Sequence, residues 1–327
     1  MIDFRYHLVS IIAIFLALAV GIVLGTTTIN QTVLRNIQSE MKRLSNDKAA
    51  QRDQIAALHR QVQAQQAFSA GAEPLLEAGA LTGQRVVVLA APGTSADLRR
   101  GLLDSLTRAG ALVTNDIRLA NNFTDPRQAN ALDDLATRLV VPGKLPAKAS
   151  GASLAAAELA AVLVAKPGTR PATPDAISTT LAGFQQGSFL SVADAPGGPA
   201  TLAVVLVPPA PAKPDDNTAA ASKIIVELAS RLAGRASATL LAGPVAAAAP
   251  GGILAVARSD RAVTQISSSV DSVDSPAGRV AAVLALRAGL AGRRGAFGFG
   301  PGASSPLPPG PSPAASPAGS PAPSPAR

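Results

Sequence analysis

The sequence begins with an uncharged apolar run, LVSIIAIFLALAVGIVLG, from Leu8 to Gly25. An α-helix rises ~1.5 Å per residue, so a helix over this run is long enough to cross most of a hydrocarbon layer of ~30 Å. We therefore expect residues 1–28 to form a membrane anchor, with lipid as the first partner of the chain.

The topology of this anchor depends on its flanks. The preceding segment is short and carries Arg5, as in a signal sequence, but the apolar run continues past a potential cleavage site at Ala17 to Ala19. Basic residues that follow the span, among them Arg35 and Lys42, favour a cytoplasmic location for the rest of the chain. Long downstream domains translocate largely regardless of charge, so we predict an uncleaved single-pass signal anchor with the remaining chain outside the cytoplasmic membrane.

Small residues recur every four positions within the anchor, at Ala13, Ala17, Gly21 and Gly25. Such a stripe allows two helix backbones to approach closely in lipid, which predicts self-association. Alternatively, Ala and Gly occur here only because both are common in membrane helices.

A heptad pattern follows over residues 29–72 and predicts a coiled-coil stalk. Lys48 and Gln51 interrupt its apolar core with one polar layer, which favours a dimer over a larger bundle. The alternative is a helix that packs back on the globular part. Phe68, Gly71 and Pro74 are expected to end the helix. The apolar core positions are Leu34, Met41, Ile55 and Val62 at heptad position a, and Ile37, Leu44 and Leu58 at heptad position d.

An α/β domain is expected over residues 73–292. The run Val86 to Ala91 reads as a strand covered on both faces, and the helical stripe Leu98 to Leu106 follows it before the next strand at Ala111 to Thr114. Strands continue to alternate with helices, down to a short strand predicted at Val263 to Ile266 and a last helix after Ser275. This alternation predicts an open, mostly parallel sheet with helices on both faces. These short, uniformly apolar strands are unlike the long alternating strands of a membrane barrel.

The remaining residues, 293–327, are rich in Pro, Ser, Ala and Gly, so we predict a disordered tail. Composition restricts the chemistry of the whole chain. There is no Cys, which excludes disulfide and thiolate chemistry, and the net charge is +8 from 29 basic and 21 acidic residues. The basic residues are scattered without an aromatic platform, so no nucleic-acid partner is expected.

Aspartates follow several predicted strands, where open α/β domains usually place their sites. The polar segment Ser267 to Ser275 makes Asp271 and Asp274 the best candidates for a polar site, ahead of Asp194 and Asp260. The alternative is that these side chains cap helices and close turns.

We expect neither an enzyme nor a cofactor. The only histidines are His7 and His59, far from any candidate nucleophile, and the turn after the first strand lacks both phosphate-loop signatures. With two His, two Met and no Cys, the chain also offers no ligand set for copper.

Three segments carry a family resemblance: the opening MIDFRYHLVSIIAIFLALAVGIVLG, the heptads after it and the late segment SSVDSVDSPAGRVAAVLAL. From Met1 to about Leu290 the chain resembles the actinobacterial MctB family of copper transport proteins. The resemblance implies an envelope protein of copper efflux and homeostasis, placed in the outer membrane, with copper ions as possible partners. It transfers no ligand residues to this chain.

Two functions therefore remain open. The first is copper export or tolerance. The second is a non-transporting envelope scaffold or signalling adaptor, for example in cell-wall or division machinery, whose stalk connects the membrane to an envelope protein partner.

Overall fold

The computed structural model describes residues 4–139, 151–193 and 197–310. It divides into two compact units, residues 1–65 and residues 66–327. The first unit consists of helix α1, which spans Phe4–Glu77 and thus also supplies the first residues of the second unit. Each unit is described by itself below.

Helix α1 ends later than the sequence predicts. Phe68, Gly71 and Pro74 all lie inside it, and the helix stops at Glu77, followed by Gly79 in the left-handed region at φ 68°. A proline in the last turn removes only one backbone hydrogen bond, and the Pro74 carbonyl still accepts one from the Ala78 amide at 3.1 Å. The prediction was wrong because side-chain contacts within the second unit, described below, hold this last turn.

The second unit is built on a sheet of seven strands in the order β3-β2-β1-β4-β5-β6-β7 among the described residues. All neighbouring pairs are parallel except β2 and β3. This confirms the predicted open, mostly parallel sheet. The strands are β1 Arg85–Ala90, β2 Leu112–Leu119, β3 Leu190–Val192, β4 Leu202–Leu206, β5 Ala238–Ala242, β6 Ser268–Val270 and β7 Ala296–Phe297.

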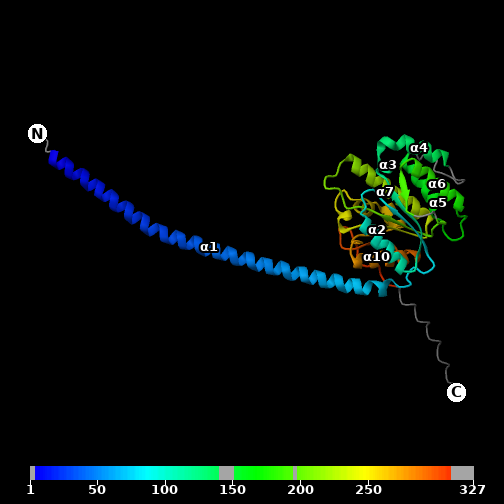
Figure 1. The fold of residues 1–327 in the computed structure, drawn as a ribbon, viewed down its shortest axis with the longest axis horizontal. Coiled ribbons are helices and arrows are strands. Elements are labelled where there is room, and N and C mark those ends of the chain that lie inside the picture. The colour runs from blue at the N-terminus through cyan, green and yellow to red at the C-terminus, as the bar shows by residue number, and fades with distance from the viewer. Residues whose placement is uncertain (1–3, 140–150, 194–196, 311–327) are drawn as a thin grey trace, which may run out of the picture. The chain divides into compact units, whose positions relative to one another are not determined.

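Helices cover both faces of the sheet (Figure 1). Strand β1 shows the division, because Val86 and Val88 pack with the helices of one face whereas Val87 and Leu89 pack with those of the other. One face carries α2 (Ala96–Arg108) and α10 (Pro276–Leu290). The other carries α3 (Asn121–Thr124), α4 (Ala129–Arg138), α5 (Ala152–Leu163), α6 (Pro174–Gln186), α7 (Asp216–Arg235), α8 (Ile253–Ser259) and α9 (Arg261–Ile266).

One predicted strand is a helix. The segment Val263 to Ile266 lies in α9, because Asp260 caps this helix and accepts a hydrogen bond from the Ala262 amide at 2.8 Å. The adjacent strand is instead β6, whose Ser268 and Ser269 are polar but buried between β5 and β7.

The second unit also extends past the predicted boundary at residue 292. Strand β7 pairs with β6, and the chain then turns back so that the Ser304 amide donates to the Ala296 carbonyl at 2.7 Å. The predicted disordered tail is therefore corrected for residues 293–310, because backbone hydrogen bonds with partners elsewhere in the fold hold this stretch despite its Gly- and Pro-rich composition. Residues 311–327 lie outside the described part.

Candidate functional site

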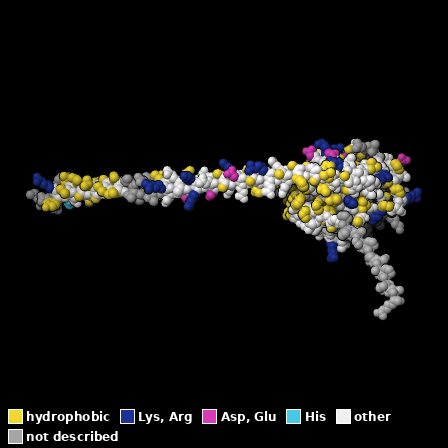
Figure 2. Space-filling model, turned by 90° about the horizontal axis from the view of Figure 1, so that it is seen from below, with side chains coloured by type: hydrophobic (Ala, Val, Ile, Leu, Met, Phe, Trp, Pro, Cys, Tyr) yellow, Lys and Arg dark blue, Asp and Glu magenta, His cyan; other side chains and the backbone are white. Residues whose placement is uncertain are grey.

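The predicted membrane anchor coincides with one stretch of α1. The span Arg5–Gly25 has 21 residues; its most apolar 18-residue window has a mean hydropathy of 2.9, and none of that window is buried within the structure. This stretch is long and apolar enough to cross a membrane. In Figure 2 hydrophobic side chains gather on the N-terminal part of α1, and charged ones appear farther along the helix.

The small residues of the anchor lie open on the surface of α1. Ala13 and Ala17 are exposed, and a Cβ added at Gly21 or Gly25 would meet no atom within 4 Å. These positions leave room for a second helix, and their use in packing stays a prediction.

The predicted stalk core is also uncovered in the single chain. Its seven apolar side chains, Leu34 through Val62, are between 48% and 67% exposed. A soluble helix rarely leaves such a periodic apolar stripe without a partner. Pairing through this stripe likewise stays a prediction.

Asp271, the first polar-site candidate, is fully buried and already has partners. Its carboxylate pairs with Arg258 Nη2 at 2.9 Å and accepts hydrogen bonds from the amides of Phe299 at 2.7 Å and Gly300 at 3.0 Å. Arg258 in turn donates to the Phe297 and Pro301 carbonyls. These contacts hold the chain after β7, so Asp271 has a structural role and offers no free carboxylate to a ligand.

Asp274, the second candidate, is exposed, and it is not brought together with Asp271 in one site. It lines a cleft of about 510 Å³ at the carboxyl ends of β1, β4, β5 and β6. Chain connections run from β1 to β2 and from β4 to β5 in opposite directions, so the cleft lies beside the switch point where α/β sheets commonly bind ligands. Its other lining residues are Ser95, Asp97, Leu98, Pro209, Pro244, Val273 and Arg279.

Most polar groups of this cleft are engaged within the protein. Ser95 accepts from the Leu98 amide as the cap of α2, Asp97 pairs with Arg100, and Arg279 pairs with Glu73. The cleft therefore offers Asp274 and apolar walls, without a nucleophile next to a base. The other two aspartates add nothing to it, because Asp260 caps α9 and Asp194 lies outside the described residues.

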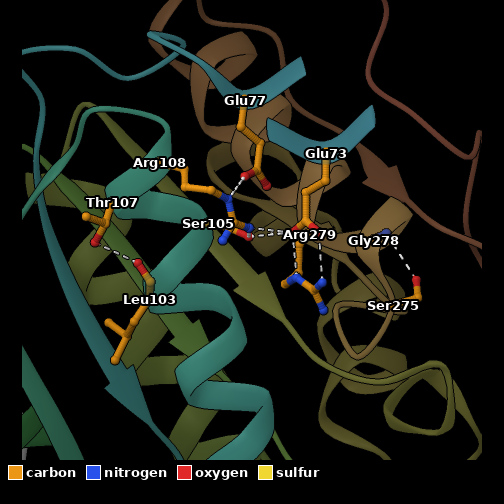
Figure 3. A network of polar contacts seen from close by, with 9 residues as sticks. All are labelled: Glu73, Glu77, Leu103, Ser105, Thr107, Arg108, Ser275, Gly278 and Arg279. Atoms are coloured by element: carbon orange, nitrogen blue, oxygen red, sulfur yellow. Dashed lines mark hydrogen bonds and ion pairs between the residues drawn. The ribbon is translucent and has the colours of Figure 1, made fainter. Parts of the chain in front are cut away.

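A polar network joins the end of α1 to the rest of the second unit (Figure 3). Both carboxylate oxygens of Glu73 accept from Arg279 of α10, at 2.7 Å from Nε and 2.9 Å from Nη2. Glu73 also accepts from Arg108 Nη2 at 2.7 Å and from the Ser105 hydroxyl at 2.9 Å, both on α2. Glu77, one turn later, accepts from Arg108 Nε at 3.0 Å. Two carboxylates and two guanidinium groups thus anchor one short segment to two helices.

The two carboxylates respond differently to this environment. Burial raises the pKa of Glu77 above its ordinary value, and the nearby Ser105 and Arg108 only partly offset this effect. Burial also acts to raise the pKa of Glu73, but hydrogen bonds from Arg279 and Ser105 and the charges of Arg279 and Arg108 outweigh burial and lower it. Glu73 is therefore the firmly ionised member of the pair.

The network contains the residues that sequence reasoning missed. Glu73 and Glu77 lie one helical turn apart, and this spacing at the end of a long helix was the available signal. Arg279 could not be assigned to them from the sequence, because it lies 206 positions away from Glu73.

Within the described residues, His, Cys, Asp and Glu nowhere form a group of three that could hold an ion. The chain as a whole contains no Cys, and its two histidines, His7 and His59, both lie on α1.

Comparison with known proteins gives one consistent result. The family model described as "Copper transport outer membrane protein, MctB" matches residues 1–308. Proteins named "Copper transporter MctB" from Mycobacterium tuberculosis (strain H37Rv) and Mycobacterium leprae are 29% and 28% identical over 312 and 316 residues. Each alignment covers 93% of this chain and 98% of the relative. Because the family model matches residues 1–308 of the 327, this chain belongs to the MctB family.

Proposed function

We propose that this chain is a single-pass, membrane-anchored envelope protein that forms dimers through its stalk and takes part in copper efflux and homeostasis. The observation that carries the architecture is the succession, within α1, of an apolar span and an exposed heptad stripe. The copper role is supported by the names of relatives that align over 93% of the chain.

The absence of Cys and the scattered His and Met determine how copper could be handled. Cu(I) sites are built from thiolate, thioether or imidazole groups, which this chain does not bring together in its described part. Copper ligands would therefore come from a partner protein or from several copies of this chain, and we assign none of the described side chains to the metal.

Copper accumulation in cells tests this function. A strain without the gene should accumulate more cell-associated copper under copper stress, and the full chain should restore the normal level. A variant with Leu44→Asp in the stalk should restore less, because dimers would be lost, whereas Asn46→Asp on the outer side of the same heptads should restore fully. Equal copper in the deletion strain and its parent would contradict the copper role.

The membrane topology is part of the proposal. We place the second unit outside the cytoplasmic membrane, held by an uncleaved anchor. Protease added to intact spheroplasts should then degrade residues 66–310, and fractionation should recover the chain with the cytoplasmic membrane. Recovery with an outer membrane fraction, or a mature chain that begins after Ala19, would contradict this topology.

A second candidate function is a scaffold that transports nothing. It is favoured by the many exposed apolar side chains of α1 together with a cleft whose polar groups are mostly engaged by the protein itself. Crosslinking in cells followed by purification should then recover one specific envelope protein, in an amount that falls with Leu44→Asp but not with Asn46→Asp. Recovery of this chain alone would count against a scaffold.

A further inference from the structure

The last turns of α1, within the second unit, carry an exposed apolar stripe. Phe68 is 78% exposed, Leu75 is 82% exposed and Leu76 is 54% exposed, and the half-buried Ala72 lies between them. Three large apolar side chains on two turns form a patch that folded proteins usually cover.

This stripe and the anchoring network occupy different sides of the same turns. At ~100° per residue, Phe68, Ala72, Leu75 and Leu76 fall within an arc of ~100° of the helix circumference. Glu73 and Glu77, which are buried against α2 and α10, fall outside this arc. The contacts of the helix with its own unit therefore leave Phe68, Leu75 and Leu76 exposed and cover part of Ala72.

The stripe keeps the heptad register of the stalk beyond a further polar layer, which consists of Gln65 at position d and Ser69 at position a. Leu76 follows Val62 by two heptads and occupies the same position, a, while Ala72 follows Leu58 by two heptads at position d. A helix that kept the stalk pairing would thus bring the same face of a second copy to these turns.

The stripe is also wider here than in the stalk. From Glu40 onward position g of the stalk is polar, at Glu40, Asp47, Gln54 and Gln61, which is typical of a narrow two-stranded seam. The g residue before them, Val33, is apolar. At the second unit the same position becomes Phe68 and then Leu75. A stripe formed by positions a, d and g is wide enough for the helix to pack against a surface that is broader than one other helix.

The network prepares this surface for binding. Arg279 and Arg108 hold Glu73 and Glu77 from the opposite side, so the backbone of these turns is already ordered before any partner arrives. Ordering in advance reduces the entropic cost of association.

We infer that the face formed by Phe68, Ala72, Leu75 and Leu76 is an interface with a second copy of this chain, in which the stalk seam continues onto the α/β unit and broadens there. The inference rests on the stalk dimer of the proposed function and adds that the α/β units of the two copies meet. Position g is the added element, because it changes from polar over Glu40 to Gln61 to apolar in this segment.

The chain contains no Cys, so single cysteines can map this interface in the full chain in its membrane. The variants are Val62→Cys in the stalk seam, Leu76→Cys in the stripe and Ala67→Cys on the outer side of the same turns. A short bifunctional thiol crosslinker should link most of the chains in the Val62→Cys and Leu76→Cys variants, and only a background fraction in the Ala67→Cys variant.

The outcomes separate this inference from the proposed function. Crosslinking of Val62→Cys with only background for Leu76→Cys would overturn the inference and leave the stalk dimer intact. Background in all three variants would overturn both. Crosslinking of Ala67→Cys as strong as that of Leu76→Cys would indicate random collision and also overturn the inference.

The role of position g has its own test. Combined with Leu76→Cys, the two substitutions Phe68→Ser and Leu75→Ser should lower crosslinking at residue 76 severalfold. Combined with Val62→Cys, the same two substitutions should leave crosslinking at residue 62 unchanged. The matched control, Ala67→Ser with Ala70→Ser, changes two exposed residues of the same turns and should alter neither. Undiminished crosslinking of Leu76→Cys in the presence of Phe68→Ser and Leu75→Ser would exclude position g from the interface.

Discussion

Arg279 donates hydrogen bonds to both carboxylate oxygens of Glu73, at 2.7 Å from Nε and 2.9 Å from Nη2, although the two residues lie 206 positions apart. A paired geometry of this kind is among the strongest polar contacts in proteins because two parallel donors meet two acceptors. It joins the end of α1 to α10, the helix that follows β6. Since Arg279 also lines the cleft at the carboxyl edge of the sheet, the same side chain connects the cleft to the end of α1.

Removing this contact should weaken the second unit. Arg279→Met leaves the buried Glu73 with only Arg108 and Ser105, which we expect to cost ~1–3 kcal/mol of unfolding free energy. Pulse proteolysis across a urea series measures this on the full chain in detergent, which suits a protein with no Trp and one Tyr. Arg100→Met is the control, because Arg100 and its partner Asp97 are 70% and 90% exposed and should contribute under ~1 kcal/mol. Equal losses in the two variants would contradict the role of Arg279.

Glu77 should make stability depend on pH in the direction opposite to an ordinary paired carboxylate. Its pKa is raised above 4.5 in the folded protein, so its contribution to stability is complete below about pH 4.5 and is lost as the pH rises through the raised value. Glu77→Gln should therefore gain stability relative to the parent as the pH rises above 4.5. Urea midpoints between about pH 4 and pH 8 measure the difference.

The companion variant for this experiment is Glu73→Gln. The pKa of Glu73 is lowered, so its contribution is present above about pH 4.5 and is lost as the pH falls through the lowered value. Glu73→Gln should thus be less stable than the parent at neutral pH and approach it in acid. The same slope for both variants would contradict the assignment of the two carboxylates.

Asp271 and Asp274 should differ sharply when each is changed to Asn. Asp271→Asn leaves the buried Arg258 guanidinium without its counter-charge, and we expect a loss of ~3–5 kcal/mol of unfolding free energy. It should also release the segment after β7, so limited proteolysis followed by mass spectrometry should find new cuts within residues 293–310. Asp274→Asn, at an exposed position, should change neither quantity. A similar small effect of both substitutions would contradict the structural role of Asp271.

The apolar strands made the sheet predictable. Val86 to Ala91 reads as a buried strand because β-branched residues without polar interruption are stable only when both faces are covered, and the structure covers them. Strand β6 escaped prediction because its serines resemble a loop, and only the flanking strands bury them.

The polar contacts could not be predicted from the sequence in this way. The position of Asp271 after a strand was visible in the sequence, but its partners come from Arg258 and from the backbone of Phe299 and Gly300, which no local pattern indicates. Likewise, Pro74 wrongly predicted the end of the helix. The carboxylate contacts of Glu73 and Glu77 that hold this turn are long-range, so the sequence does not reveal them. Local patterns predicted most of the strands and helices, with β6 and α9 as exceptions, and contacts distant in sequence decided the end of α1 and the course of the chain after β7.

A charge inside the stalk seam should separate the two copies. Leu44 lies at position d and is 58% exposed in the single chain, so a dimer would bury it. Leu44→Asp would place two carboxylates in that seam, and we expect the dimer to weaken by at least about a hundredfold, since loss of each buried Leu alone costs ~2–5 kcal/mol. Light scattering of the detergent-solubilised chain, corrected for detergent mass, should show a dimer for the parent and a monomer for the variant.

The matched control for this variant is Asn46→Asp. Asn46 lies two positions later, at position f on the side of the helix away from the seam, so the same added charge should leave the dimer intact. This comparison separates the effect of the seam from that of net charge. A monomeric parent chain, or equal weakening by both substitutions, would mean that the exposed heptad stripe of α1 is covered by something other than a second copy.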